Sequence, residues 1–140
     1  MPTVNSSAPA HAEPLRAQSL GLSLTVKDLP KSLKFYTEVL GMTKARDIER
    51  DGKVVAVALA AGDVHLSINQ DDGKKGKDRA FGVGFSIRFT TTQSIDAVAA
   101  NAKKAGAKLD QEPADMPWGA RIFSLTDPDG YKLVVSSPRR

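Results

Sequence analysis

An alternating strand pattern occurs twice in this chain, and each copy leads into a helical stretch. Residues 21–26 read Gly-Leu-Ser-Leu-Thr-Val, and residues 84–89 read Gly-Phe-Ser-Ile-Arg-Phe. Each helical stretch has apolar residues at helical spacing and ends at a glycine, Gly41 in the first copy and Gly106 in the second. A duplicated strand–helix unit predicts one pseudo-symmetric domain, in which two halves wall a shared cavity.

The remaining segments extend each copy to a β-α-β-β-β module. The first module is expected to contain, in order, a strand at 19–27, a helix from Asp28 to Leu40, and strands at 43–49, 53–60 and 64–69. The second is expected to contain a strand at 84–89, a helix at 93–105, a weak strand after Gly106, and strands at 120–126 and 131–136. The pattern predicts an α+β fold: two tandem modules forming a curved, mostly antiparallel sheet around a cavity, with helices on the outer face.

Residues 1–18 are rich in Ala, Pro and Ser and have no apolar period, which predicts a flexible N-terminal arm. We expect a single domain over 19–137, in which module 1 covers about 19–70, a linker 71–82, and module 2 about 83–137.

Composition excludes several classes of function. The chain has 140 residues and no cysteine, so disulfides, thiolate nucleophiles and cysteine metal sites are absent. The net charge of +4 comes largely from a loop at 72–77 and from the two C-terminal arginines, without interleaved aromatic residues, so no nucleic-acid partner is expected. No apolar run has the length of a membrane span or signal peptide, so we expect no membrane partner and a cytoplasmic location.

Two segments resemble a known family. Residues 26–36 (Val-Lys-Asp-Leu-Pro-Lys-Ser-Leu-Lys-Phe-Tyr), followed by Val-Leu-Gly-Met at 39–42, are similar to the opening of a vicinal oxygen chelate protein. Residues 117–121 (Pro-Trp-Gly-Ala-Arg) and 127–131 (Asp-Pro-Asp-Gly-Tyr) resemble the closing motif of its second module. This is the glyoxalase, bleomycin-resistance and extradiol-dioxygenase superfamily. The resemblance implies paired modules around a cavity, usually in a homodimer, with a small-molecule ligand.

In the metal enzymes of this superfamily, four strand residues hold a divalent ion. The resemblance places these positions at Gly21, His65, Gly84 and Val134. Glycine and valine have no side-chain lone pair, and a catalytic ion typically needs about three protein ligands. We therefore expect no metal and no cofactor.

The strand face that carries these positions collects small and polar residues. The two glycines leave room for a ligand, or are simply tolerated in weakly packed strands. Arg88 and Lys132 would attract an anionic ligand, or instead pair with an acid or reach solvent. The candidate ligand-binding residues are Ser23, His65, Ser67, Ser86, Arg88, Trp118 and Arg121.

His65 is the candidate catalytic residue, because it is the only histidine of the domain and the only group expected to titrate near neutral pH. It could equally be a rim histidine hydrogen-bonded to a serine. Trp118 could form a flat wall for a ligand or fill the core.

Two classes of function remain. The preferred one is a metal-free small-molecule binder that sequesters a drug or metabolite. The alternative is a lyase, isomerase or dioxygenase of the same superfamily that uses an atypical metal site or metal-independent chemistry through His65. A weaker third hypothesis is an interaction module that works through the arm and the loop lysines. Whether the modules pair within one chain or across a dimer stays open.

Overall fold

The computed structural model describes residues 13–138, which form two four-stranded sheets and two helical segments. The first sheet has the order β1-β4-β3-β2, with strands β1 (Leu22–Val26), β2 (Thr43–Arg50), β3 (Lys53–Ala61) and β4 (Val64–Gln70). The second has the order β5-β8-β7-β6, with strands β5 (Ser86–Thr90), β6 (Leu109–Asp115), β7 (Ala120–Thr126) and β8 (Lys132–Pro138). The tandem β-α-β-β-β fold is confirmed.

Both sheets have the same mixed topology. The first strand of each module, β1 or β5, lies at a sheet edge and pairs in parallel with the last strand of that module. The other pairs in each sheet are antiparallel. The two sheets are not hydrogen-bonded to each other in the described part of the chain, so the eight strands form two separate sheets and not one continuous sheet.

The first helix is shorter and less regular than its apolar spacing predicts. Helix α1 (Leu29–Lys34) is capped by Asp28, whose Oδ1 accepts a hydrogen bond from the Lys31 N–H at 3.1 Å. It continues as a π-helical turn, η1 (Phe35–Val39), in which the Thr37 hydroxyl donates to the Leu33 carbonyl at 2.8 Å. Such a bond within a helix favours bending.

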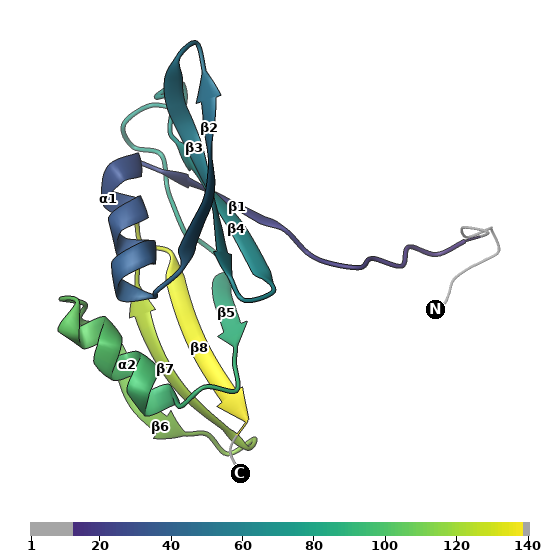
Figure 1. Ribbon diagram of the computed structural model, residues 1–140, viewed down its shortest axis with the longest axis vertical. Helices are drawn as coiled ribbons and strands as arrows, with labels where there is room; N and C mark the ends of the chain where they lie inside the picture. The colour runs from purple at the N-terminus through teal and green to yellow at the C-terminus, as the bar shows by residue number, and fades with distance from the viewer. Residues whose placement is uncertain (1–12, 139–140) are drawn as a thin grey trace.

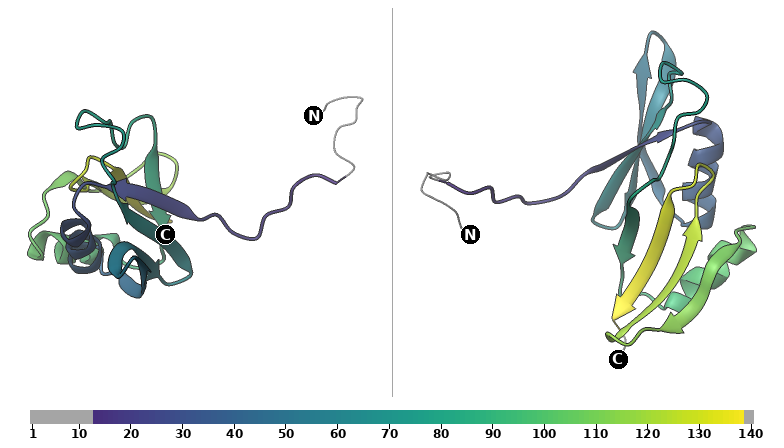
Figure 2. Two further views of the ribbon diagram at one scale, coloured as in Figure 1. Left: turned by 90° about the horizontal axis from the view of Figure 1, so that it is seen from above. Right: turned by 180° about the vertical axis from the view of Figure 1, so that it is seen from behind.

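The second helix, α2 (Ile95–Lys104), begins at Ser94, whose hydroxyl accepts from the Ala97 N–H at 3.2 Å. Both helical segments lie on the same side of the sheets (Figures 1 and 2). Their buried side chains join those of the strands in one core that includes Leu24, Tyr36, Phe123 and Leu133. In the described part of the chain, the strands therefore bury one face under the helices, and no further layer covers the other face.

The turn that contains the Asp-Pro-Asp-Gly motif fastens module 2 to module 1. The Tyr36 hydroxyl donates to Asp127 Oδ2 at 2.7 Å, and the Tyr131 hydroxyl donates to the Thr25 carbonyl at 2.8 Å. Asp129 accepts from the Lys27 N–H at 3.0 Å and from the Ser32 hydroxyl at 3.2 Å. Tyr36 and Asp127 are both buried, so this contact lies away from water, and the burial raises the pKa of both groups.

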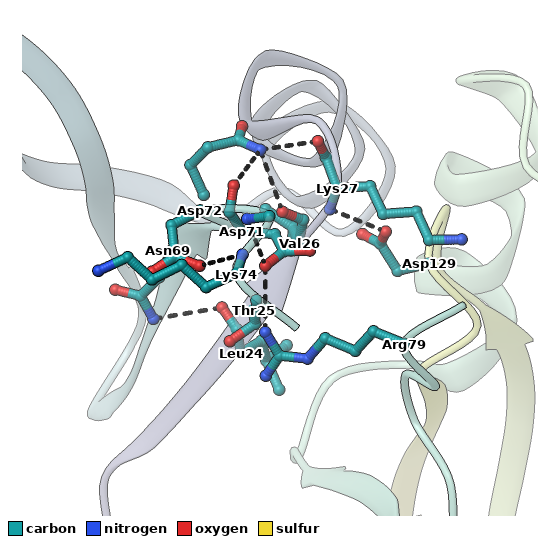
Figure 3. A network of polar contacts seen from close by, with 12 residues as sticks. Leu24, Thr25, Val26, Lys27, Asn69, Asp71, Asp72, Lys74, Arg79 and Asp129 are labelled. Atoms are coloured by element: carbon teal, nitrogen blue, oxygen red, sulfur yellow. Dashed lines mark hydrogen bonds and ion pairs between the residues drawn. The ribbon is translucent and has the colours of Figure 1, made fainter. Parts of the chain in front are cut away.

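The segment between β4 and β5 lies against the same junction (Figure 3). Arg79 pairs with Asp71 at 3.1 Å, and its guanidinium lies 5.4 Å from the centre of the Phe81 ring. Lys27 approaches that ring as well, at 5.2 Å. The segment is therefore held by polar and cation–π contacts, as well as by its chain connections.

The N-terminal segment from residue 13 extends away from the sheets, as Figure 1 shows. The sequence pattern places Leu20 on the buried face of the first strand, and this prediction is wrong. Leu20 is 93% exposed, because β1 begins only at Leu22 and no helix lies over the preceding residues. Residues 1–12 of the predicted arm lie outside the described residues.

None of the helices in the described range is both long and apolar enough to cross a membrane.

Candidate functional site

We call the uncovered side of the two sheets the open face and define it by strand register. Side chains alternate along a strand, and directly paired residues project to the same side. Leu24, Leu66 and Val57 point to the helices, so their neighbours in sequence point to the open face. On the first sheet, the open face carries Ser23, Thr25, Ala56, Ala58, Ala60, His65, Ser67 and Asn69.

Three polar side chains meet on the first sheet, and we call them the Ser23 cluster: Ser23, Ser67 and Asn69. The Ser67 hydroxyl donates to Ser23 Oγ at 3.2 Å. The Asn69 amide donates to the same Ser23 oxygen and, at 3.2 Å, to the Leu24 carbonyl. Beside the cluster, β3 contributes only the small side chains of Ala56 and Ala58 on this side. The cluster can offer hydroxyl and amide groups to a ligand.

His65 lies on the open face in the first residues of β4, and its neighbour Leu66 pairs with Leu22 of β1. The His65 side chain is exposed. The structure therefore places this imidazole two positions before Ser67 on the same strand and side, where it is accessible to solvent.

On the second sheet, the open face carries Ser86 and Arg88 from β5 and Lys132 and Val134 from β8. Ser86 pairs with Lys132, and Arg88 pairs with Val134. Ser86, Arg88 and Lys132 are exposed, and Val134 is half-buried. The structure thus brings the candidates Ser86 and Arg88 together with Lys132, which sequence reasoning had placed on this face without assigning it to the site.

Arg121 lies on the helix side of its sheet, away from the open face. Its guanidinium donates to both oxygens of Asp96 on α2, at 2.8 and 2.9 Å, and to Asp115 on β6 at 3.1 Å. These hydrogen bonds raise the pKa of Arg121, and the bond from Arg121 lowers the pKa of Asp96. Arg121 therefore ties α2 to the sheet and does not join the other candidates.

Trp118 also stands apart from the other candidates. It lies in the turn between β6 and β7 and is 64% exposed, so it does not fill the core. The first residue after that turn in β7, Ala120, pairs with Pro138 near the C-terminal end of the described chain. Trp118 lies in module 2 and the Ser23 cluster in module 1, and the two are not brought together within one chain.

Of the four positions that the sequence resemblance assigns to a metal, only His65 has a side chain that can coordinate one. Gly21 lies just before β1, and a side chain there would meet nothing within 4 Å. Gly84 lies before β5 with φ of +86°, a conformation that strains any residue with a side chain. Val134 of β8 pairs with Arg88 of β5, so it lies beside β5 and not opposite Gly84, which precedes that strand. In the described part of the chain, no three His, Cys, Asp or Glu residues are grouped to hold an ion.

The open face is not enclosed within one chain. The best-defined pocket in the described structure, of about 340 Å³, lies on the helix side and is lined by residues such as Phe35, Val39, Ala107 and Pro128. A second one lies beside α2 and is lined by residues such as Ala99 and Lys103. Neither pocket includes any of the candidate ligand-binding residues. Neither of these two pockets is the cavity that the sequence predicts on the face with the candidate residues.

Solved structures share this fold. TioX from Micromonospora sp. ML1 superposes with a TM-score of 0.71 at 17% identity, over 87% of this chain and 99% of that one. A glyoxalase/bleomycin resistance protein/dioxygenase superfamily member from Sphaerobacter thermophilus gives a TM-score of 0.68 at 25% identity, over 87% of this chain and 98% of that one.

Curated relatives extend the similarity to sequence. A probable lactoylglutathione lyase of Vibrio cholerae is 31% identical over 123 residues, which cover 80% of this chain and 84% of the relative. A lactoylglutathione lyase of Haemophilus influenzae is 28% identical, over 83% of this chain and 89% of the relative. The chain spans only 42% of the length of the lactoylglutathione lyase GLX1 of Arabidopsis thaliana, at 27% identity over 81% of this chain.

A family model described as the Glyoxalase/Bleomycin resistance protein/Dioxygenase superfamily matches residues 16–135, which include both modules. This match, the shared fold and the sequence relatives agree, and the chain belongs to the glyoxalase/bleomycin resistance protein/dioxygenase superfamily.

Proposed function

We propose that this protein binds a small molecule on the open face of its sheets and does so without a divalent metal ion. One observation carries the proposal: three of the four positions that the sequence resemblance assigns to the ion of the superfamily's enzymes are occupied by Gly21, Gly84 and Val134. His65 alone cannot anchor a catalytic ion, which typically needs about three protein ligands. What the face offers instead is the Ser23 cluster, His65, Ser86 and Arg88.

The binding cavity is completed by a second copy of the chain. Within residues 13–138, the open face has no covering layer. Pairing two copies through their open faces would turn two uncovered surfaces into an enclosed site. We expect light scattering after size exclusion to give the mass of a dimer. A monomeric mass at the concentration used for ligand binding would contradict this expectation.

An enzymatic function is the alternative, and the names of the relatives favour it. Both bacterial relatives described above are named lactoylglutathione lyases, at about 30% identity. In that case His65, accessible on the open face, would act as a general base or as one ligand of an atypical metal site. The difference at the other three metal positions is the reason for preferring binding to catalysis.

Calorimetry on the dialysed full-length protein separates the two functions. Titration with Zn²⁺, Ni²⁺ or Mn²⁺ is expected to give no one-to-one complex tighter than about 1 μM. The same samples, with each metal present, are expected not to turn over lactoylglutathione, and the Haemophilus influenzae relative serves as the positive control. A tight one-to-one complex would overturn the proposal. Turnover that disappears in His65→Ala, with the fold intact, would establish the alternative.

A further inference from the structure

We propose that Arg88 and Lys132 form an anion-binding subsite on the open face, so that the ligand carries a carboxylate or phosphate group. The inference rests on the proposed binding function and narrows it to a class of ligand. It follows from strand register, from the pairing of charges in the described structure, and from the groups around the two cations.

Strand register places the two cations on one side of neighbouring strands. Ser86 pairs with Lys132 and Arg88 pairs with Val134 across the parallel β5–β8 ladder. Arg88 is therefore diagonal to Lys132, two positions further along, and both side chains project from the open face. Both are exposed and lie within regular strands, so their backbone positions are fixed while their charged ends remain accessible.

Neither cation has an acidic partner among the described residues, whereas several others do. Carboxylates pair with Arg79, Arg121, Lys44 and Lys103. The acid nearest in register to Lys132 is Asp110, which accepts a hydrogen bond from Thr126, the residue opposite Lys132 on β7. No ion pair joins Asp110 to Lys132 in the described structure. Two like charges on neighbouring strands repel each other, and a bound anion would remove that repulsion.

The surroundings favour an organic anion. A guanidinium can donate two parallel hydrogen bonds to a carboxylate or phosphate, and an ammonium adds a compact charge. The Ser86 hydroxyl, opposite Lys132, can bond a further oxygen of the anion. Val134, half-buried between Arg88 and Ser124 in the ladder, offers apolar contact to the rest of the molecule.

The chain contains a matched control for the charge effect. Arg50 and Lys53 also face each other on neighbouring strands, as the last and first residues of β2 and β3. Both are exposed and neither forms an ion pair within the described residues, but they flank the Asp51-Gly52 turn at the end of a hairpin. If any arginine beside a lysine attracted anions, the backbone amides of residues 50–53 would shift with the anion as those of residues 86–88 do.

Nuclear magnetic resonance of the ¹⁵N-labelled full-length protein tests the subsite. Sodium phosphate, sodium acetate and neutral acetamide are titrated separately at constant ionic strength. We expect phosphate or acetate to give saturable shifts of the backbone amides of residues 86–88 and 132–134, and acetamide to give none. The stronger of the two anions shows whether phosphate or carboxylate is preferred. Arg88→Gln should weaken binding by at least about tenfold, because a charge-assisted bond is lost, and Lys132→Gln should weaken it too.

Arg50→Gln should leave the titration unchanged, and the dispersed amide spectrum of each variant shows that it is folded. Equal binding by Arg88→Gln and the unmodified protein would overturn the inference, as would equal losses in Arg88→Gln and Arg50→Gln. These outcomes are independent of the metal titration. Anion binding lost in Arg88→Gln would support the subsite even if a metal complex rejected the proposed function. If the protein binds no metal and its amides do not shift with either anion, the anion subsite is rejected while the proposed function stands.

Discussion

Replacing Gly82 by alanine is expected to lower the free energy of unfolding by about 3 kcal/mol, from left-handed backbone strain and overpacking together. Gly82 has φ of +68°, and a Cβ there would lie 2.7 Å from the Gly130 oxygen and 3.0 Å from the Tyr131 Cα. Both are backbone atoms of the turn that fastens the two modules together, so they cannot rotate away. Either the turn or the segment carrying Phe81 must move, and the contacts between the modules weaken.

Gly73→Ala is the matched control for this prediction. Gly73 has nearly the same backbone conformation, with φ of +79°, but a Cβ there would meet nothing within 4 Å. Gly73→Ala is therefore expected to lower the free energy of unfolding only by the cost of the left-handed conformation, about 1 kcal/mol. Urea denaturation of both variants and of the unmodified protein measures the difference. Equal losses in Gly82→Ala and Gly73→Ala would show that the close approach to Gly130 contributes nothing.

The succession of strands and helix along each module could be predicted from local signals in the sequence. Asp51 and Gly52 both have positive φ, 54° and 75°, as a two-residue hairpin turn requires, and β2 and β3 flank them as expected. The alternation of Leu24 and Val26 with Ser23 and Thr25 correctly separated the buried face from the open face. The alternation of apolar residues and the residue types of tight turns are local properties, so they can be recognised in a single sequence.

The features that could not be predicted from the sequence depend on tertiary packing. The division of the first helical stretch into α1 and η1 does not show in apolar spacing, because both forms bury Leu29, Tyr36 and Val39. The pairing of Arg121 with Asp96 depends on how α2 packs against β6 and β7. The two motif residues Trp118 and Arg121 are close in sequence, but neither lies on the open face. Trp118 lies in the turn between β6 and β7, and Arg121 projects from β7 toward the helices.

The candidate site was predictable in part for the same reason. Ser23 and Ser67 meet because β1 and β4 pair in parallel, and alternation alone placed both on one face. Asn69 and Lys132 were not among the predicted site residues, because their importance depends on register: Asn69 bonds Ser23, and Lys132 is the neighbour of Arg88. Register between strands distant in sequence is set by packing, which single residues do not reveal.

Asp127→Ala is expected to cost about 3 kcal/mol of unfolding free energy at neutral pH, since it leaves buried donors without an acceptor. Asp127 is 5% exposed. Its Oδ1 accepts from the Asp129 and Tyr131 N–H groups, each at 2.9 Å, and its Oδ2 accepts from the Tyr36 hydroxyl at 2.7 Å. The substitution removes all three bonds at the junction of the modules, and thermal and urea denaturation measure the loss.

Asp127→Asn is the informative comparison, because it keeps the shape and removes the charge. The amide oxygen can accept from the same two backbone N–H groups, and the amide nitrogen can donate to the Tyr36 hydroxyl, so the loss at neutral pH should stay within about 1 kcal/mol. Burial raises the pKa of Asp127 above its ordinary value of 3.8. A raised pKa in the folded state means that the protonated carboxyl is the better tolerated form. Its contribution to stability is therefore fully present below about pH 4 and is lost as the pH rises through the raised pKa.

The stability of the unmodified protein relative to Asp127→Asn should consequently fall as the pH is raised from about 4, and then level off once the carboxyl is ionised in the folded state. Urea denaturation of both proteins at several pH values gives this difference directly, because titrations elsewhere in the chain are common to both. A difference that rises with pH would mean that the ionised carboxylate is the favoured form at the junction, so that the hydrogen bonds from Tyr36 and the backbone outweigh burial. Such a result would assign the junction's stability to the hydrogen bonds that the ionised carboxylate accepts.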